Sequence, residues 1–202
     1  MAEMVDVYLS PSLQEWNVGV GNYGTEEQRM NLLADVVQYE LERHGLDVAR
    51  NRPEMSLAEV VRESNAIGPT VHVALHSNAA NGQARGAEIY AHRFGGAGEA
   101  LARDIFEFLE PLTPTSDLGV KEGYSTFNGQ GMYELRRTVA PAVLAEVGFH
   151  DNPDDAQFII DNIYEIGQAI SQGILQNFGI NYVPDTPENV ALLQNRYNGV
   201  LF

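Results

Sequence analysis

Cysteine is absent from the 202-residue sequence, which excludes disulfide bonds and thiolate metal ligands. Any bound metal must then be held by His, Asp, Glu or neutral oxygen donors. Basic residues are scarce, with 12 Lys and Arg against 28 Asp and Glu, so the formal net charge is −16. This charge repels phosphate backbones and anionic surfaces. We therefore expect no nucleic-acid partner, and we expect substrate binding to depend on a local cleft.

Long apolar runs are also missing. No segment approaches the ~18 residues that a membrane-spanning helix needs. The first residues, Met1 to Asp6, lack the basic region and the apolar core of an export signal. These absences predict no membrane insertion and synthesis in the cytoplasm without an export signal. Length and hydrophobic content, 202 residues and 44%, are typical of one globular domain.

Strand and helix patterns alternate along the chain. Short apolar runs that indicate strands lie at 5–9, 46–49, 71–75, 86–92 and 141–147. Helical spacing predicts helices after Thr25 and after Ser56, each a favoured N-cap residue, and also over 98–110 and 153–178. Such alternation predicts an α/β fold, in which a single domain has a mixed twisted sheet with helices on both faces.

The composition changes near residue 181. Pro184 and Pro187 interrupt the chain, and Val190, Leu193 and Tyr197 lie at helical spacing. We predict a main domain over residues 1–180, followed by a tail over 181–202 that forms a short amphipathic helix or a linker.

Three predicted element ends each carry a group suited to metal or acid–base chemistry. Glu26 opens the first helix, His76 ends the strand that begins near 71, and Glu146 closes the strand over 141–147. A glutamate in a first turn is usually explained by the helix dipole, and a lone histidine after a buried strand is often structural. An unpaired carboxylate between Ala145 and Val147 is harder to explain structurally, because burying an unpartnered charge is costly.

Three sequence words carry a family resemblance: Gly24-Thr25-Glu26, the segment 74–79 (ALHSNA) and the segment 144–152 (LAEVGFHDN). In order and spacing they resemble the zinc-dependent N-acetylmuramoyl-L-alanine amidases, over roughly residues 5–179. These cell-wall hydrolases, which include autolysins and phage endolysins, cut the amide between N-acetylmuramic acid and the L-alanine of the stem peptide. The resemblance implies that residues 1–180 form an amidase catalytic domain, with peptidoglycan as substrate and Zn²⁺ as cofactor.

The resemblance also implies a metal site. The family holds zinc with a histidine after the first strand, a glutamate opening the first helix and a histidine ending the third strand; Glu26 and His76 match the last two. Where the family has Asp-Pro-Gly-His-Gly-Gly, this chain has SPSLQE at 10–15, so Leu13 stands in place of the histidine. This segment resembles a subclass found in bacterial and phage lysins, which favours Gln14 as the third ligand. Two alternatives stay open: Glu15 could supply the oxygen ligand instead, or the site could have lost its affinity for metal.

By its match to the family, Glu146 is the catalytic residue. Zinc would acidify a water molecule and polarise the substrate carbonyl, while Glu146 would take the water's proton and return it to the departing amine. Three protein ligands would leave one position open on the metal.

Four further residues are candidates for substrate binding: Asn78, Glu134, Arg136 and His150. Each also has an ordinary interpretation. Asn78 could close a turn, and Glu134 and Arg136 could belong to a solvated run of charges with Arg137. His150 could be a surface histidine beside the loop that follows its strand.

Two other functions fit the same residues. A different zinc peptidase would use the same chemistry on another amide, and a degenerate, non-catalytic wall-binding module would explain the missing histidine. For an active amidase without an export signal, we expect action on the bacterial cell wall after release through a phage holin or by cell lysis. The sequence does not indicate the oligomeric state.

Overall fold

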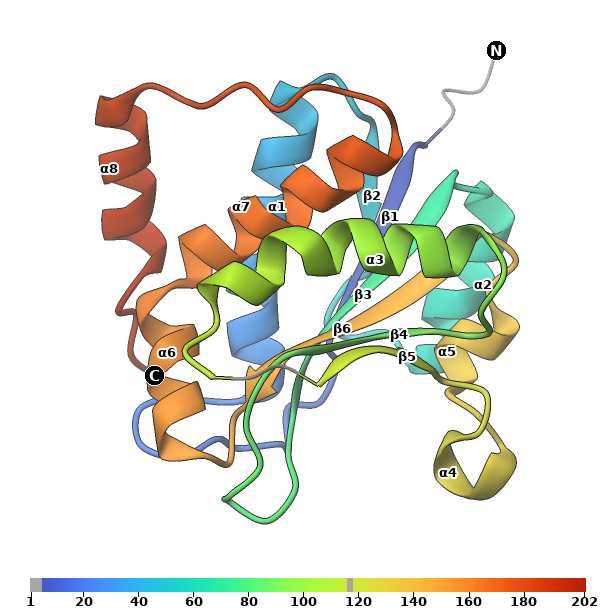
Figure 1. Ribbon diagram of the computed structural model, residues 1–202, viewed down its shortest axis with the longest axis horizontal. Coiled ribbons are helices and arrows are strands. Elements are labelled where there is room, and N and C mark those ends of the chain that lie inside the picture. Colours follow the sequence, from blue (N-terminus) through green and yellow to red (C-terminus); the bar gives the residue numbers. More distant parts are fainter. Residues whose placement is uncertain (1–4, 116–117) are drawn as a thin grey trace.

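The computed structural model describes residues 5–115 and 118–202, and a six-stranded sheet lies at its centre (Figure 1). The strands are β1 (Val7–Pro11), β2 (Val48–Arg50), β3 (Val71–Asn78), β4 (Glu88–Ala91), β5 (Gly119–Glu122) and β6 (Ala142–Phe149). Their order is β2-β1-β3-β6-β4-β5. All neighbouring strands are parallel except β4 and β6, which are antiparallel. The predicted mixed sheet is confirmed.

Helices cover both faces of this sheet, as predicted. Alternate residues of the central strands, such as Val73 and Leu75, join one large core with α1 (Glu26–Arg43), α3 (Ala97–Leu109) and α7 (Ile163–Asn177). The opposite face carries a smaller apolar cluster, in which Ala74 and Leu144 pack near Leu135 of α5 (Tyr133–Arg137). Helix α2 (Leu57–Ile67) lies on that second face, because its Ser64 contacts His72 of β3. The two faces follow from the two-residue period of a strand.

Capping boxes set the starts of α1 and α2. The Thr25 hydroxyl accepts from the Gln28 amide at 3.2 Å, and the Gln28 side chain accepts from the Thr25 amide at 2.9 Å. Ser56 and Glu59 make the same reciprocal pair at α2. These bonds satisfy amide groups that a helix start leaves unpaired. The first one fixes Glu26 in the opening turn of α1.

The structure differs from the sequence-based prediction in several short elements. The helix predicted over 153–178 is two helices, α6 (Pro153–Asp161) and α7, because the chain leaves helical geometry at Asn162, with φ −131°. Strand β5, the 3-10 helix Glu110–Leu112 and the short helices α4 (Thr126–Gly129) and α5 were not predicted. They have too few residues to show a hydrophobic period.

The tail runs back over the helices that cover the large core (Figure 1). It contains α8 (Pro187–Tyr197), which begins at the N-cap Thr186 and contacts α7. Tyr197 is buried in the large core. In the ranges that the structure describes, no helix is both long and apolar enough to cross a bilayer. Part of the segment used to predict the lack of an export signal, residues 1–4, lies outside those ranges.

Candidate active site

Neighbouring strands bring three chemically active side chains into one row. In the parallel pair β3 and β6, His76 lies in register with Glu146. In the antiparallel pair β4 and β6, Glu88 lies in register with the same Glu146. Residues in register on adjacent strands point to the same face. The row therefore lies on the face that carries α2 and α5.

Helix α1 adds Glu26 to this row. Its Oε1 lies 2.7 Å from Nδ1 of His76, and its Oε2 accepts from Nδ2 of Asn17 at 2.8 Å. Burial alone would raise the pKa of Glu26, but the hydrogen bonds from His76 and Asn17 lower it below its usual value. Burial likewise acts to lower the pKa of His76, yet the hydrogen bond and negative charge of Glu26 raise it to about 9. The two groups stabilise each other's charged forms.

Asn17 connects Glu26 to Gln14. Its Nδ2 lies 2.8 Å from Oε1 of Gln14 as well as 2.8 Å from Oε2 of Glu26. One amide group thus holds the two oxygens close together, whereas Glu15 is exposed. Gln14 and Leu13 both line the cleft that contains His76. The structure therefore brings together the three residues predicted as ligands.

Glu146 differs from its neighbours in lacking a partner. Its buried oxygen Oε2 has no hydrogen bond within the described part of the chain. Burial raises the pKa of Glu146 to about 8; the positive charge of His76 opposes this rise, and the carboxylates of Glu26 and Glu88 add to it. A carboxyl group with a pKa near neutrality can both accept and return a proton.

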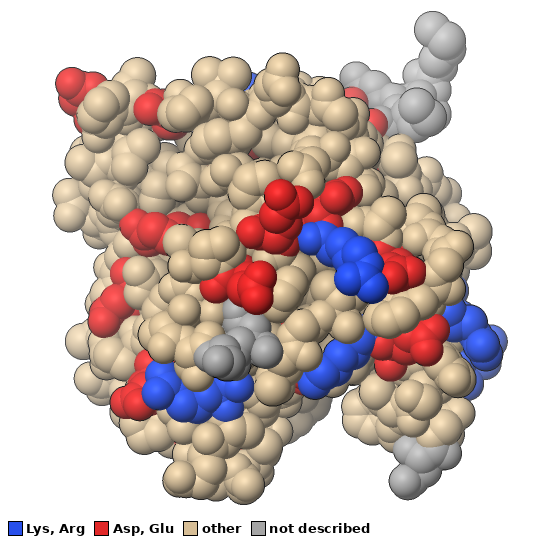
Figure 2. All heavy atoms as spheres, in the orientation of Figure 1, with Lys and Arg blue, Asp and Glu red and all other residues tan. Residues whose placement is uncertain are grey.

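A cleft of about 970 Å³ is lined by Gln14, His76 and Glu146, whereas Glu26, which contacts His76, does not line it. Its walls come from the loop 10–16, the segment 53–57 and the segment 127–136, and its floor includes His76 and Glu146. Two aromatic residues of the walls are unusually open to solvent, since Trp16 is 70% exposed and Phe127 is 69% exposed. On the face that Figure 2 shows, basic side chains lie between acidic ones.

Two of the four predicted substrate-binding residues line this cleft. Arg136 is exposed there, and no side-chain hydrogen bond or ion pair is found for it among the described residues. Glu134 is buried, and its Oε1 lies 2.8 Å from Nε2 of His72. The alternative that Glu134 belongs to a solvated run of charges is therefore wrong, because its partner His72 is itself fully buried and also contacts Ser64.

The other two candidates do not line the cleft. Asn78 donates from Nδ2 to Oε1 of Glu88 at 2.7 Å. His150 is buried, so the expectation of a surface histidine is wrong; its Nδ1 lies 2.9 Å from Oγ of Ser77, which accepts from the Tyr23 hydroxyl at 2.7 Å. Asn78 thus contacts Glu88 of the row, and His150 contacts Ser77, which follows His76 in the chain.

Sequence reasoning missed two residues of the site. Asn17 lies in a polar loop with nothing in the sequence to mark it. Glu88 is buried in β4, where it accepts from Asn78 and from the Tyr90 hydroxyl and pairs with Lys121. A carboxylate inside the predicted strand 86–92 was a usable signal, because the same argument had singled out Glu146.

Comparison with known proteins identifies the family. The profile of the N-acetylmuramoyl-L-alanine amidases matches residues 7–176. The chain belongs to this amidase family. It is 26% identical over 186 residues to the N-acetylmuramoyl-L-alanine amidase CwlM of Bacillus licheniformis, covering 88% of this chain and 70% of that protein. It is also 31% identical over 163 residues to the uncharacterised protein YqiI of Bacillus subtilis, covering 77% of this chain and 75% of the relative.

A solved structure agrees with this family fold. The catalytic domain of CwlV, an N-acetylmuramoyl-L-alanine amidase from Bacillus (Paenibacillus) polymyxa, superposes with a TM-score of 0.77 at 23% identity. The superposition covers 88% of this chain and 100% of that domain. At this identity the likeness establishes the shared α/β architecture.

The predicted ligands include only two side chains of the types that commonly hold zinc. No group of three His, Cys, Asp or Glu side chains able to hold a metal occurs among residues 5–115 and 118–202. Of the three predicted ligands, His76 and Glu26 are residues of these types, and Gln14 would add a neutral amide oxygen. These nitrogen and oxygen donors suit zinc, although a neutral amide binds it more weakly than an imidazole.

Proposed function

We propose that this amidase-family protein hydrolyses the amide between N-acetylmuramic acid and L-alanine in peptidoglycan, with Zn²⁺ held by His76, Glu26 and Gln14. The observation that carries the proposal is the buried carboxylate oxygen of Glu146, which has no hydrogen-bond partner among the described residues and belongs to a residue in register with His76 in the cleft. A buried charge without a partner is costly, and such groups concentrate at functional sites. Membership of the amidase family supports the same chemistry.

The contacts among the predicted ligands and Asn17 support a metal site here. His76 and Glu26 are already in contact, and the Asn17 amide holds the Gln14 and Glu26 oxygens. When bound, zinc supplies a Lewis acid that polarises a carbonyl and acidifies a water molecule. Asn17 then acts as a positioning residue, since it orients two oxygen donors without binding the metal itself.

Glu146 performs the proton transfers in this proposal. Its carboxylate takes a proton from the attacking water and gives it to the nitrogen of L-alanine as the amide bond breaks. An amine cannot leave as an anion, so both transfers are needed. The raised pKa of Glu146, about 8, suits a group that must hold and release a proton near neutral pH.

The cleft walls provide the groups that would bind substrate. Arg136 offers a guanidinium that has no partner among the described residues, and such a group suits a carboxylate of the stem peptide. The exposed rings of Trp16 and Phe127 offer apolar surfaces at the rim. Asn78, Glu134 and His150 act as positioning residues, through Glu88, His72 and Ser77 respectively.

Leu13 favours a second candidate function, that of a non-catalytic wall-binding module, because Leu13 stands where the family has a metal-binding histidine. A single substitution separates the two functions. His76→Ala should abolish zinc binding and the release of new L-alanine amino groups from purified cell walls. His92→Ala provides the control, because His92 does not line the cleft.

Three outcomes of that experiment are decisive. Zinc-free protein that still hydrolyses walls contradicts the proposed chemistry. Wall binding without zinc or hydrolysis in the unmodified protein supports the non-catalytic module. New amino groups on residues other than L-alanine indicate another zinc peptidase. The route to the wall, through a phage holin or by cell lysis, stays a prediction from the sequence.

A further inference from the structure

Residues 198–202 contact the part of the chain that delivers Glu26 and Asn17 to the candidate site, and they do so through Val200 and Phe202. They lie outside the residues 7–176 that match the amidase family. Arg29, one turn after Glu26 on α1, makes the contact. Its guanidinium donates to the Val200 carbonyl at 2.8 Å, the Asn22 carbonyl at 3.2 Å and the Tyr23 carbonyl at 2.6 Å.

Arg29 is fully buried, and it makes no ion pair with an acidic residue in the described part of the chain. A buried guanidinium needs other compensation, because losing its hydration is costly. Backbone carbonyls and two aromatic rings provide it. The guanidinium carbon lies 5.2 Å from the Tyr23 ring centre and 4.9 Å from the Phe202 ring centre, in the range of cation–π contacts.

A second observation, the close packing of Phe202 against Gly24, is independent of the Arg29 contacts. A Cβ atom at Gly24 would lie 2.7 Å from Cβ and Cδ2 of Phe202, closer than such atoms can approach. Gly24 also has φ +81°, a conformation that glycine adopts readily. The Phe202 ring thus rests directly on the backbone that precedes Thr25 and Glu26.

The loop held by Arg29 is the loop that orients the predicted ligands. Within it, the Gly19 amide donates to the Gly24 carbonyl at 3.0 Å, and the Glu26 amide donates to the Asn17 carbonyl at 2.8 Å. Asn17 in turn orients the side chains of Gln14 and Glu26. The contacts of residues 198–202 with loop 17–25 are therefore linked to the predicted ligands in two steps. The first is the backbone hydrogen bonds of the loop, and the second is the side chain of Asn17.

We propose that residues 198–202 form a positioning segment for the candidate metal site, acting through Arg29 on loop 17–25. This inference rests on the proposed function for the identity of the metal ligands. It assigns a role in the site to residues beyond those shared with the family. Arg29 is a positioning residue, since its guanidinium contacts backbone carbonyls and none of the predicted ligands.

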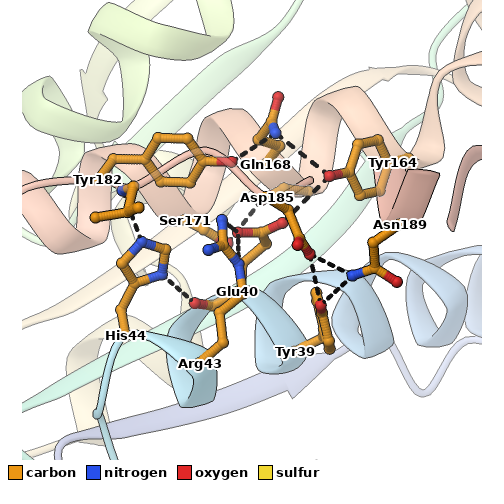
Figure 3. A network of polar contacts seen from close by, with 12 residues as sticks. Tyr39, Glu40, Arg43, His44, Tyr164, Gln168, Ser171, Tyr182, Asp185 and Asn189 are labelled. Atoms are coloured by element: carbon orange, nitrogen blue, oxygen red, sulfur yellow. Dashed lines mark hydrogen bonds and ion pairs between the residues drawn. The ribbon is translucent and has the colours of Figure 1, made fainter. Parts of the chain in front are cut away.

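The same tail has a second attachment, far along α1, that serves as an internal comparison. There the Tyr39 hydroxyl donates to Asp185 at 2.6 Å and accepts from Asn189 at 2.6 Å (Figure 3). His44 and Gln168 hold the tail at Val183 and Tyr182 in the same region. This attachment stabilises the tail without touching loop 17–25, so weakening it should change stability alone.

The test uses two variants of the positioning segment and two matched controls in the full chain. Phe202→Ala removes one ring beside Arg29, and Arg29→Lys removes the forked donors while keeping the charge. Leu201→Ala is the neighbouring control: Leu201 is 60% exposed and Phe202 is 49% exposed, but the contacts with Arg29 and Gly24 are made by Phe202. Tyr39→Phe is the control for lost tail attachment. The readouts are hydrogen–deuterium exchange at Gly19 and Glu26, zinc affinity by chelator competition, and thermal unfolding.

Phe202→Ala and Arg29→Lys should speed exchange at both amides and weaken zinc binding, each about tenfold, the factor that corresponds to about 1.4 kcal/mol. Leu201→Ala should change none of the readouts, and Tyr39→Phe should lower only the unfolding temperature. Unchanged exchange in Phe202→Ala overturns the proposal, as does an equal effect of Tyr39→Phe. If the unmodified protein binds no zinc, the proposed function fails, while the exchange rates still decide the positioning role.

Discussion

Nδ1 of His76 and Oε1 of Glu26 lie 2.7 Å apart, although 50 positions separate them in the sequence. His76 comes from β3 and Glu26 from the first turn of α1. Their contact joins a nitrogen and an oxygen donor beside Glu146, whose buried Oε2 has no hydrogen bond within the described residues.

Glu146→Gln should retain zinc and lose turnover by a factor of ~100 or more, the scale for removing a general base. It should also raise the melting temperature of the zinc-free protein, because an unpartnered carboxylate is removed from a buried position. Zinc content, kcat and thermal unfolding measure these effects. Glu54→Gln is the control at the cleft rim. Loss of zinc from Glu146→Gln would make Glu146 a ligand instead of a base.

Gln14→Ala should weaken zinc binding, because it removes the third donor, which we expect at ~2.0 to 2.2 Å from the metal. Zinc titration compares this variant with Glu15→Ala. Glu15 is the next residue in the chain, and its carboxylate is exposed. A large loss in Glu15→Ala alone would transfer the ligand role to Glu15. Equal affinity in both variants and the unmodified protein would leave a site with two protein donors, too weak for catalysis.

Arg136→Ala should raise KM for peptidoglycan fragments about tenfold or more, the scale of a charge-assisted hydrogen bond, with little change in kcat. The adjacent Arg137→Ala is a close control, because Arg137 lies over the Tyr133 ring and does not line the cleft. Steady-state kinetics on fragments with free and amidated stem-peptide carboxylates would show which group Arg136 binds. Equal KM values for the two variants would refute a role in substrate binding.

Glu134→Gln should reduce stability at neutral pH by about 1 to 3 kcal/mol, because it weakens a buried, charge-assisted contact with His72. Burial acts to raise the pKa of Glu134, but the hydrogen bond and charge of His72 hold it below its ordinary value of 4.5. The lowered pKa therefore contributes stability above pH 4.5, and this contribution is lost as the pH falls below that value.

Urea unfolding between pH 7 and pH 3 tests this dependence. The stability difference between Glu134→Gln and the unmodified protein should shrink as the solution is acidified. The exposed Glu54→Gln should show no such trend. A constant difference over the whole range would mean that the charge of Glu134 does not contribute.

The sequence by itself determined the fold class and much of the element order. Strong local signals were responsible, such as the capping residues Thr25 and Ser56 and the apolar run that begins at Val71. It also singled out Glu26, His76 and Glu146, because each stands where an element ends or where a charge is costly to bury. Such properties depend on near neighbours in the chain, so periodicity and motif order reveal them.

Only the tertiary structure decided which of these groups meet. The register of β3 with β6 places His76 beside Glu146, and the packing of α1 against the sheet brings Glu26 to His76. The amide of Asn17 and the buried Arg29 gain their roles from contacts that no local pattern encodes. Pairings across 50 or 171 positions depend on strand register and on long-range burial, which are properties of the whole folded chain.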